Sequence, residues 1–292
     1  MNVSNAKIVS MPDKIYLCAI SNVLSGSCLE DCHFCTQSSK YKTDIQRYNF
    51  KPFENVIKEA KKAKNSQAVG FCLVTSGLGL DSKRKKYMIE LLEALQNEDL
   101  NLNFIGCNGI ASLEDLKDLK KAGLGSYNHN LETSKDYYKK ICSTHSWEDR
   151  YKTAQSVKEA GLKLCSGGIF GMGESKKDRD DFINSLSTLQ PDSVAINFYV
   201  PNPALPLKEN TITKKQAKDI IFQIKDRLPK SRIMVAGGRE YFFKDSLKEL
   251  FELGVNSIVI GDYLTTKGEK EDKDIKVINE LGLKIAKSCS DA

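Results

Sequence analysis

The feature that most constrains the fold of this chain is an alternation of short apolar segments with longer amphipathic ones. Eight segments rich in Val, Ile and Phe have the composition of buried β-strands: residues 14–23, 68–77, 102–109, 124–132, 162–173, 193–201, 232–239 and 256–264. Segments between them, such as residues 53–64, 112–123 and 246–254, place apolar side chains three or four positions apart, as helices packed on a sheet do. Eight β–α units predict the α/β class, a (β/α)8 TIM-type barrel that forms a single domain.

The predicted barrel spans residues 15–285, between an N-terminal extension of residues 1–14 and a polar C-terminal tail of residues 286–292. A chain of 292 residues has a length that α/β barrels commonly reach as one domain. Helix ends support the predicted boundaries, because Gly123 and Gly254 directly follow helical segments. Ser112 with Asp115 three residues later is close to a capping box.

Composition and charge argue against several classes of function. No apolar run approaches the roughly 20 residues that span a bilayer. Residues 1–14 contain no continuous apolar core of a signal peptide, so we expect a cytoplasmic protein that does not bind membranes. The net charge is +6, but the lysines are spread over predicted helix faces and no RNA- or DNA-binding motif accompanies them. We therefore expect no nucleic-acid partner.

The cysteines favour metal or redox chemistry. The chain contains nine, an odd number, and shows no export signal, which disfavours a disulfide framework. Cys28, Cys32 and Cys35 follow the first predicted strand with the spacing C-x3-C-x2-C. A structural zinc site needs a fourth ligand, and His33 is adjacent to Cys32, which breaks the usual ligand spacing. A metal group held by three ligands has a position open for another molecule.

Several predicted strands carry sulfur or charge where a parallel strand buried on both faces should carry Val, Ile or Leu. Cys72, Cys107 and Cys165 lie in three different strands, and Arg239 lies at the end of the seventh. A single buried cysteine is commonly a packing residue. A buried arginine, however, needs an anionic partner. Three thiolates and one cation in the barrel lumen could surround an iron–sulfur cluster.

Polar residues also follow one face of the fourth predicted strand. Asn128, Asn130 and Glu132 are two positions apart, which places all three on the same side. Asn197 lies in the sixth predicted strand. These residues could be hydrogen-bonded within the core, but three in succession would need many buried partners. A polar ligand in the lumen supplies such partners more simply.

The motifs resemble those of a known family. The triplet, with Phe34 beside its third cysteine, resembles the signature of radical S-adenosylmethionine enzymes. The segments YNHNLET (127–133), CSGGIFGMGE (165–174), VAGGRE (235–240) and DYLTT (262–266) are similar, in this order, to the biotin synthase family, and the resemblance runs from about residue 16 to residue 283. It implies an enzyme, a radical sulfurtransferase that inserts sulfur into dethiobiotin to form biotin. A 4Fe–4S cluster would cleave S-adenosylmethionine to a 5′-deoxyadenosyl radical, and a 2Fe–2S cluster would donate the sulfur.

The resemblance implies roles for individual residues. Cys28, Cys32 and Cys35 would hold the 4Fe–4S cluster, with its fourth iron left for S-adenosylmethionine. The implied ligands of the 2Fe–2S cluster are Cys72, Cys107, Cys165 and Arg239. The implied contacts to S-adenosylmethionine are Phe34, Thr75, Ser76, Gly77, Asn130, Glu132 and His145, with the glycine-rich residues 167–174 near the adenosine. The implied contacts to dethiobiotin are Asn128, Thr265 and Thr266 at its carboxylate and Asn197 at its ureido ring. The implied protein partners are a reducing electron donor of flavodoxin or ferredoxin type and a second copy in a homodimer.

The chain departs from the family pattern at several positions. Glu132 stands where familiar members carry Asp, and His145 and Gly70 stand where some members have Arg. Cys18 lies in the first predicted strand, where some members have Ser, and could face the second cluster or be a bystander. Two further cysteines, Cys142 and Cys289, match no motif, and we expect no role for Cys289 in its polar tail.

Two alternative functions stay open from the sequence. One is another radical enzyme of similar fold, a carbon-skeleton mutase or a hydrogenase-maturation protein, which need not carry the strand cysteines or the arginine. The other is a basic, RNA-binding metalloprotein in which Cys28, Cys32 and Cys35 are structural. Such a protein should bind RNA with steep salt dependence.

Overall fold

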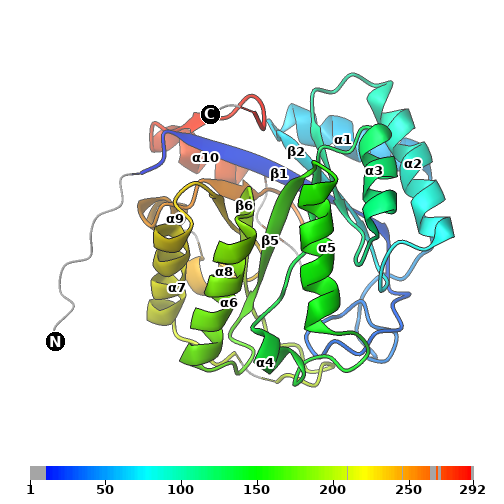
Figure 1. Ribbon diagram of the computed structural model, residues 1–292. Helices are drawn as coiled ribbons and strands as arrows, with labels where there is room; N and C mark the ends of the chain where they lie inside the picture. Colours follow the sequence, from blue (N-terminus) through cyan, green and yellow to red (C-terminus); the bar gives the residue numbers. More distant parts are fainter. Residues whose placement is uncertain (1–10, 209, 245, 264–267, 269–270, 291–292) are drawn as a thin grey trace, which may run out of the picture.

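The computed structural model describes residues 11–208, 210–244, 246–263, 268 and 271–290, and it contains a closed barrel of parallel strands (Figure 1). The described barrel strands are β1 (Lys14–Leu24), β2 (Gly70–Thr75), β3 (Asn103–Cys107), β4 (Ser126–Asn128), β5 (Lys163–Phe170), β6 (Ser193–Phe198), β7 (Arg232–Val235) and β8 (Ser257–Val259). Barrel strands that follow one another in the sequence pair with each other, and β1 pairs with both β2 and β8. This last pairing closes the sheet and confirms the predicted (β/α)8 TIM-type barrel.

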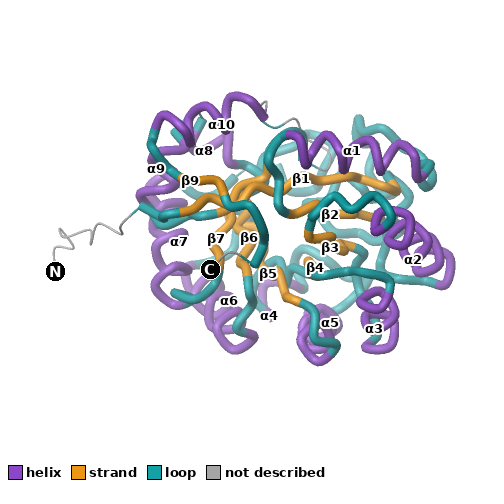
Figure 2. Tube along the Cα trace, turned by 90° about the horizontal axis from the view of Figure 1, so that it is seen from above, coloured by secondary structure: helices purple, strands orange, loops and turns teal. Residues whose placement is uncertain are grey.

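Helices surround the barrel on its outside, as the view in Figure 2 shows. In the described ranges they are α1 (Phe53–Asn65), α2 (Ser82–Gln96), α3 (Leu113–Lys121), α4 (Lys135–Tyr138), α5 (Trp147–Glu159), α6 (Lys176–Leu189), α7 (Lys214–Arg227), α8 (Arg239–Phe243), α9 (Leu247–Glu252) and α10 (Glu271–Glu280). The predicted capping box at the start of α3 is present, because Ser112 and Asp115 each accept a hydrogen bond from the other's backbone N–H. None of the helices in these ranges is both long and apolar enough to cross a membrane.

The two faces of each strand have different surroundings. Leu73, Leu164 and Ile233 are fully buried, and they alternate along their strands with residues that line the lumen, such as Cys72 and Cys165. The apolar face packs on the helices and supplies the hydrophobic core. The other face leaves room in the lumen for sulfur and polar groups, which explains why the strands do not read as continuous apolar runs.

The C-terminal residues pack against the barrel. A short strand, β9 (Lys284–Ile285), pairs with the first residues of β1. Beyond it, Ala286 is buried in a small cluster with Tyr16 and Val69, and Cys289 packs against that cluster. The Cys289 thiol also donates a hydrogen bond of 3.4 Å to the carbonyl of Val69. The described part of the predicted polar tail therefore covers the N-terminal end of the barrel.

Candidate active site

A cavity of about 480 Å³ extends from the lumen to the loops that follow the C-terminal ends of the strands. In TIM-type barrels these loops carry the active site. The residues on its wall that bear on function are Cys18, Phe34, Cys35, Gln37, Cys72, Cys107, Asn128, Asn130, Glu132, Cys165, Asn197, Met234 and Tyr263. Thr265 and Thr266, which were predicted to bind the substrate carboxylate, lie outside the described residues.

The predicted cysteine triplet lies in the loop that follows β1. Cys28 and Cys32 are buried, and Cys35 lies on the cavity wall. The backbone N–H of Ser39 donates to the Cys28 carbonyl at 2.7 Å, and that of His33 donates to the carbonyl of Ile141 at 2.9 Å. Burial raises the pKa of Cys35 to about 11, and the nearby Cys28 thiol adds to the rise. A thiol with a raised pKa keeps its proton, so a metal group bound here would have to displace the proton of Cys35.

A carboxylate fastens the triplet loop to the segment that follows α4. Asp31 accepts hydrogen bonds from the backbone N–H of Ser143 at 2.9 Å and from the Thr144 hydroxyl at 3.1 Å. Partial burial would raise the pKa of Asp31, but these hydrogen bonds outweigh it and lower the pKa below its usual range. The aspartate between the first two cysteines of the motif therefore has a structural role.

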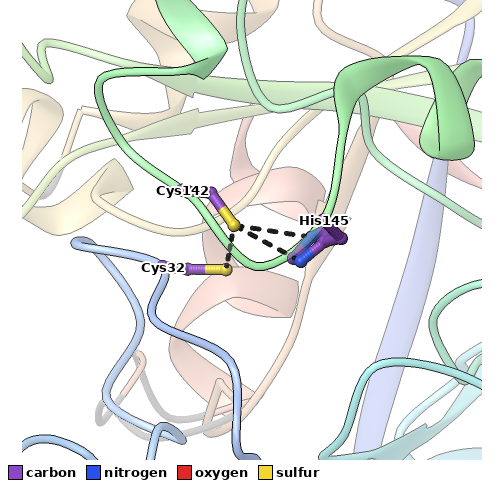
Figure 3. A group of neighbouring side chains, drawn as sticks. All are labelled: Cys32, Cys142 and His145. Atoms are coloured by element: carbon purple, nitrogen blue, oxygen red, sulfur yellow. Dashed lines mark hydrogen bonds between the residues drawn. The ribbon is translucent and has the colours of Figure 1, made fainter.

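Behind the triplet, Cys32 meets two residues that come from the segment after α4 (Figure 3). The Cys32 thiol donates to the Cys142 sulfur at 3.7 Å, and that sulfur lies 3.3 Å from Nδ1 of His145. The ligand atoms of these three residues lie within 4.8 Å of one another, close enough to hold one metal ion. Cys142 matches no motif of the family, although its C-x2-H spacing with His145 is a recognisable signal in the sequence.

His145 was predicted to contact S-adenosylmethionine, but its ring is enclosed by protein groups. Its nitrogens lie 2.7 Å from the Tyr138 hydroxyl and 2.8 Å from the Glu30 carboxylate. Burial would lower the pKa of His145, but hydrogen bonds with Cys142 and Glu30 raise it. The structure therefore places His145 behind Cys32 and away from the cavity wall.

The three strand cysteines come together in the lumen. Cys72, Cys107 and Cys165 all line the cavity, although they belong to β2, β3 and β5. A hydrogen bond with Cys107, together with burial, raises the pKa of Cys72. Burial raises the pKa of Cys165 to about 11, and the Cys107 thiol contributes to that rise. Soft thiolates gathered in a small, buried space suit iron–sulfur clusters. Their function as ligands stays a prediction.

Arg239 does not join these cysteines. The strand β7 ends at Val235, and Gly238, at a φ of +80°, turns the chain so that Arg239 begins α8. Its guanidinium binds the buried Asp274 carboxylate in two places, at 2.9 and 3.2 Å, and donates to the Tyr263 hydroxyl at 3.2 Å. The expectation of a strand arginine beside the cysteines is corrected, because Arg239 begins α8 and forms ion pairs with Asp274 of α10 and with its neighbour Glu240.

The polar face that was predicted for the fourth strand lines the cavity. In the described part of the chain, Oδ1 of Asn128, Oδ1 of Asn130 and Nε2 of Gln37 are buried without a hydrogen-bond partner. All three residues lie on the cavity wall. Unpartnered buried polar atoms are costly, so this wall fits a polar ligand that completes their hydrogen bonds.

Glu132 is held in an unusual backbone conformation at the edge of this wall. Its φ is +68°, a strained region for a residue with a side chain, and such strain is common at functional sites. A Cβ at Gly168 would lie 2.3 Å from the Glu132 carbonyl oxygen, so only glycine fits there. The close approach that the glycine-rich segment permits is thus an approach to Glu132. Any approach of this segment to adenosine stays a prediction.

Arg150 is a partly buried cation that matches no motif in the sequence. It donates to the Asn130 carbonyl at 3.0 Å and lies 3.6 Å from the Glu132 carboxylate. Burial raises the pKa of Glu132, and the charge of Arg150 opposes that rise. Arg150 lies three residues after Trp147 and four before Ala154, both on the buried face of α5. An arginine on the buried face of a predicted helix would have been the signal in the sequence for a functional cation.

The other predicted contacts divide into two groups. Phe34 and Asn197 lie on the cavity wall, although the Asn197 amide already bonds to the backbone of Gly168 and Gly237 at 3.2 and 2.9 Å. Thr75, Ser76 and Gly77 lie at the end of β2, away from the cavity wall. There the Ser76 hydroxyl accepts from the backbone N–H of Ser27 at 3.3 Å, which supports the start of the triplet loop.

Comparison with known proteins identifies the class and then the family. Residues 22–186 match the Radical SAM superfamily, and residues 195–284 match the Biotin and Thiamin Synthesis associated domain. The chain is 54% identical over 276 residues to "Biotin synthase" of a Nitratiruptor species, and the match covers 94% of this chain and 99% of the relative. It is 52% identical over 276 residues to "Biotin synthase" of Campylobacter jejuni (strain 81-176), with the same coverage of 94% and 99%. This chain belongs to the biotin synthase family of radical S-adenosylmethionine enzymes, and the resemblance seen in the sequence is confirmed.

Solved structures of more distant proteins share the fold. The FeFe-hydrogenase maturase HydG from Carboxydothermus hydrogenoformans superposes with a TM-score of 0.82 at 18% identity, covering 95% of this chain and 69% of that one. Methylornithine synthase (PylB) superposes with a TM-score of 0.78 at 19% identity, covering 94% and 84%. At this level of identity the likeness shows the barrel fold alone.

Proposed function

We propose that this chain inserts sulfur into dethiobiotin to form biotin. The observation that carries the proposal is one cavity that gathers the strand cysteines Cys72, Cys107 and Cys165 and also reaches Cys35 of the triplet. A radical enzyme that transfers sulfur needs both groups next to its substrate. Membership of the biotin synthase family supports the same assignment.

The residues fit the cofactors of the family. Bound at the two cysteine groups, a 4Fe–4S cluster would supply the electron that cleaves S-adenosylmethionine, and a second iron–sulfur cluster would supply the sulfur atom. We assign the first site to Cys28, Cys32 and Cys35 and the second to Cys72, Cys107 and Cys165. Arg239 is left out of the second site because Asp274 already neutralises it.

For S-adenosylmethionine we propose contacts with Phe34, Asn130 and Glu132. All three lie on the cavity wall near Cys35, and the Asn130 amide oxygen is ready to accept a hydrogen bond. Arg150 acts as a positioning residue, because it fixes the backbone of Asn130 and faces Glu132. The predicted contacts at Ser76 and His145 are better assigned to support of the triplet loop. Thr75 and Gly77, which flank Ser76, are kept as predicted contacts.

For dethiobiotin we propose that Asn128 binds one end of the substrate. Its Nδ2 makes one long hydrogen bond of 3.6 Å to the Cys107 sulfur and can exchange it for the substrate carboxylate. Asn197 faces the ureido ring, where it would exchange a bond to Gly168 or Gly237. The apolar parts of the wall, such as Ile105 and Val259, exclude water from a reactive radical.

The remaining expectations concern the surroundings of the enzyme. We propose that it works in the cytoplasm, forms a homodimer and receives electrons from a flavodoxin- or ferredoxin-type protein. These proposals rest on the family resemblance. The molecular mass of the protein in solution tests the homodimer, and reduction of the protein by a flavodoxin or ferredoxin tests the electron donor.

The test of the proposed function is an anaerobic assay of the reconstituted protein. We expect about six irons per chain, four in one cluster and two in the other, with matching sulfide. Reduced protein with S-adenosylmethionine and dethiobiotin should form 5′-deoxyadenosine and biotin. Bound zinc without iron, or 5′-deoxyadenosine without any biotin from protein that carries both clusters, would contradict the proposal.

A further inference from the structure

A fourth cysteine shares the lumen with the three strand cysteines. Cys18 on β1 lines the same cavity and is buried, with 7% of its surface exposed. It pairs in register with Gly70, and Cys72 lies two residues further along β2. Because side chains alternate along a strand, Cys18 and Cys72 lie on the lumen side of neighbouring strands.

The glycine opposite Cys18 provides the room for its thiol. A Cβ at Gly70 would lie 2.8 Å from the Cys18 sulfur, closer than two such atoms can approach. Gly70 does not have the positive φ that would call for glycine on conformational grounds. The absence of a side chain at position 70 therefore matters for space, and the Cys18 sulfur occupies that space.

The electrostatic neighbours of Cys18 are other thiols. Burial raises the pKa of Cys18 to about 12, and the thiols of Cys289 and Cys165 add to the rise, while Arg232 and a hydrogen bond from Ser257 oppose it. Cys18 in turn makes a small contribution to the raised pKa of Cys72. Cys18 thus belongs to the same cluster of sulfur atoms, and its burial would not prevent ligation, because metal binding displaces the proton.

The other residues near this site are weaker candidates for a fourth ligand. Arg239 is bound to Asp274, and β7 presents Met234 to the cavity. Iron–sulfur clusters are held mainly by cysteine thiolates, and a thioether is a weaker ligand. We propose that Cys18 is the fourth protein ligand of the auxiliary iron–sulfur site, beside Cys72, Cys107 and Cys165. This inference rests on the proposed function, which places a cluster at those three residues.

The experiment compares full-length variants after anaerobic reconstitution with ⁵⁷Fe and sulfide. Cys18→Ala and Cys18→Ser test the ligand, and Cys72→Ala is the reference for loss of the auxiliary cluster. Cys289→Ala is the matched control, because it removes a nearby cysteine that does not line the cavity, and Met234→Leu tests the thioether. The readouts are iron per chain, the Mössbauer spectrum, and cleavage of S-adenosylmethionine, which reports the triplet site separately.

We expect Cys18→Ala to lose most of the auxiliary iron, as Cys72→Ala does, and to keep cleaving S-adenosylmethionine. Cys18→Ser, which keeps the side-chain volume, should retain some iron with a shifted Mössbauer signal, because an oxygen replaces a sulfur ligand. Cys289→Ala and Met234→Leu should retain the wild-type iron content. Wild-type iron and spectra in both Cys18 variants, with loss in Cys72→Ala, would overturn the role of Cys18. Retention in Cys72→Ala as well would instead overturn the auxiliary site of the proposed function.

Discussion

The two groups of cysteines meet at one cavity but are positioned by different means. Cys28, Cys32 and Cys35 lie within one loop, which hydrogen bonds from Ser39, Ser143 and Thr144 hold in place. Cys72, Cys107 and Cys165 belong to three strands, and the register of the sheet brings them together. The first group is therefore a local arrangement, and the second exists only when strands β2 to β5 have paired.

This difference teaches that the two halves of the proposed chemistry are separable. The triplet would need its loop, the segment that follows α4 and the support of Ser76 at the end of β2. The auxiliary site would need several strands at once. Changes in one group should therefore leave the other group's function measurable.

The largest expected effect is on the triplet. Cys32→Ala should abolish cleavage of S-adenosylmethionine, because a cluster held by the two remaining cysteines is lost or misassembled. The measurement is the amount of 5′-deoxyadenosine formed by dithionite-reduced protein. Cys289→Ala is the control, because it also removes one cysteine but one that belongs to neither group. Undiminished 5′-deoxyadenosine from Cys32→Ala would refute the assignment of the triplet.

A second prediction separates a structural arginine from a cluster ligand. Arg239→Met should destabilise the protein by about 3–5 kcal/mol, because the buried Asp274 carboxylate loses its ion pair with the guanidinium. The double variant Arg239→Met with Asp274→Leu removes both charges and should recover most of that loss. Denaturant unfolding of the cluster-free protein measures both. A single variant of normal stability whose reconstituted form lacks auxiliary iron would show that Arg239 is a ligand after all.

A third prediction concerns the substrate end of the cavity. Asn128→Ala should weaken dethiobiotin binding by about 1.5–3 kcal/mol, since a charged group loses a hydrogen bond, which corresponds to roughly 10- to 150-fold in Kd. Isothermal titration with dethiobiotin and with its methyl ester gives the comparison. If both ligands bind the variant as they bind the wild type, the carboxylate lies elsewhere.

The smallest expected effect is on the fastening of the triplet loop. The pKa of Asp31 is lowered in the folded protein, so its carboxylate stabilises the fold above its ordinary pKa of 3.8, and this contribution is lost as the pH falls below that value. Asp31→Asn should cost about 1 kcal/mol at pH 7, a modest amount because the group is partly exposed. The two proteins should converge in stability only as the pH falls through the lowered pKa of the folded protein, well below 3.8. A difference that is independent of pH would mean that the charge of Asp31 is not what holds the loop.

Much of the barrel could be predicted from the sequence because apolar periodicity distinguishes strands from helices over most of the chain. The end of the seventh strand could not, because the predicted strand of residues 232–239 includes the glycine at which the chain turns. In the structure Gly238 turns the chain, and Arg239 points to Asp274 on α10. A partner 35 positions away in the sequence leaves no local signal.

In the candidate site, too, features within one segment could be predicted and contacts between distant segments could not. The triplet was visible as spacing within one loop, and the polar face of the fourth strand was visible as a period of two. Arg150 and Cys142 were missed because they reach the site from a helix and from the segment after α4, through packing that no motif records. The position of Cys289 against Val69 depends likewise on tertiary contacts.

The central claim, that one cysteine group cleaves S-adenosylmethionine and the other donates sulfur, is tested most directly with Cys165→Ala. Cys165 lies on the cavity wall in β5, separate from the triplet loop. The measurement is anaerobic turnover with dethiobiotin, with 5′-deoxyadenosine and biotin quantified separately. We expect the variant to keep forming 5′-deoxyadenosine, at a reduced rate, and to form no biotin. A normal yield of biotin from Cys165→Ala would contradict the account, because Cys165 would then be a packing residue.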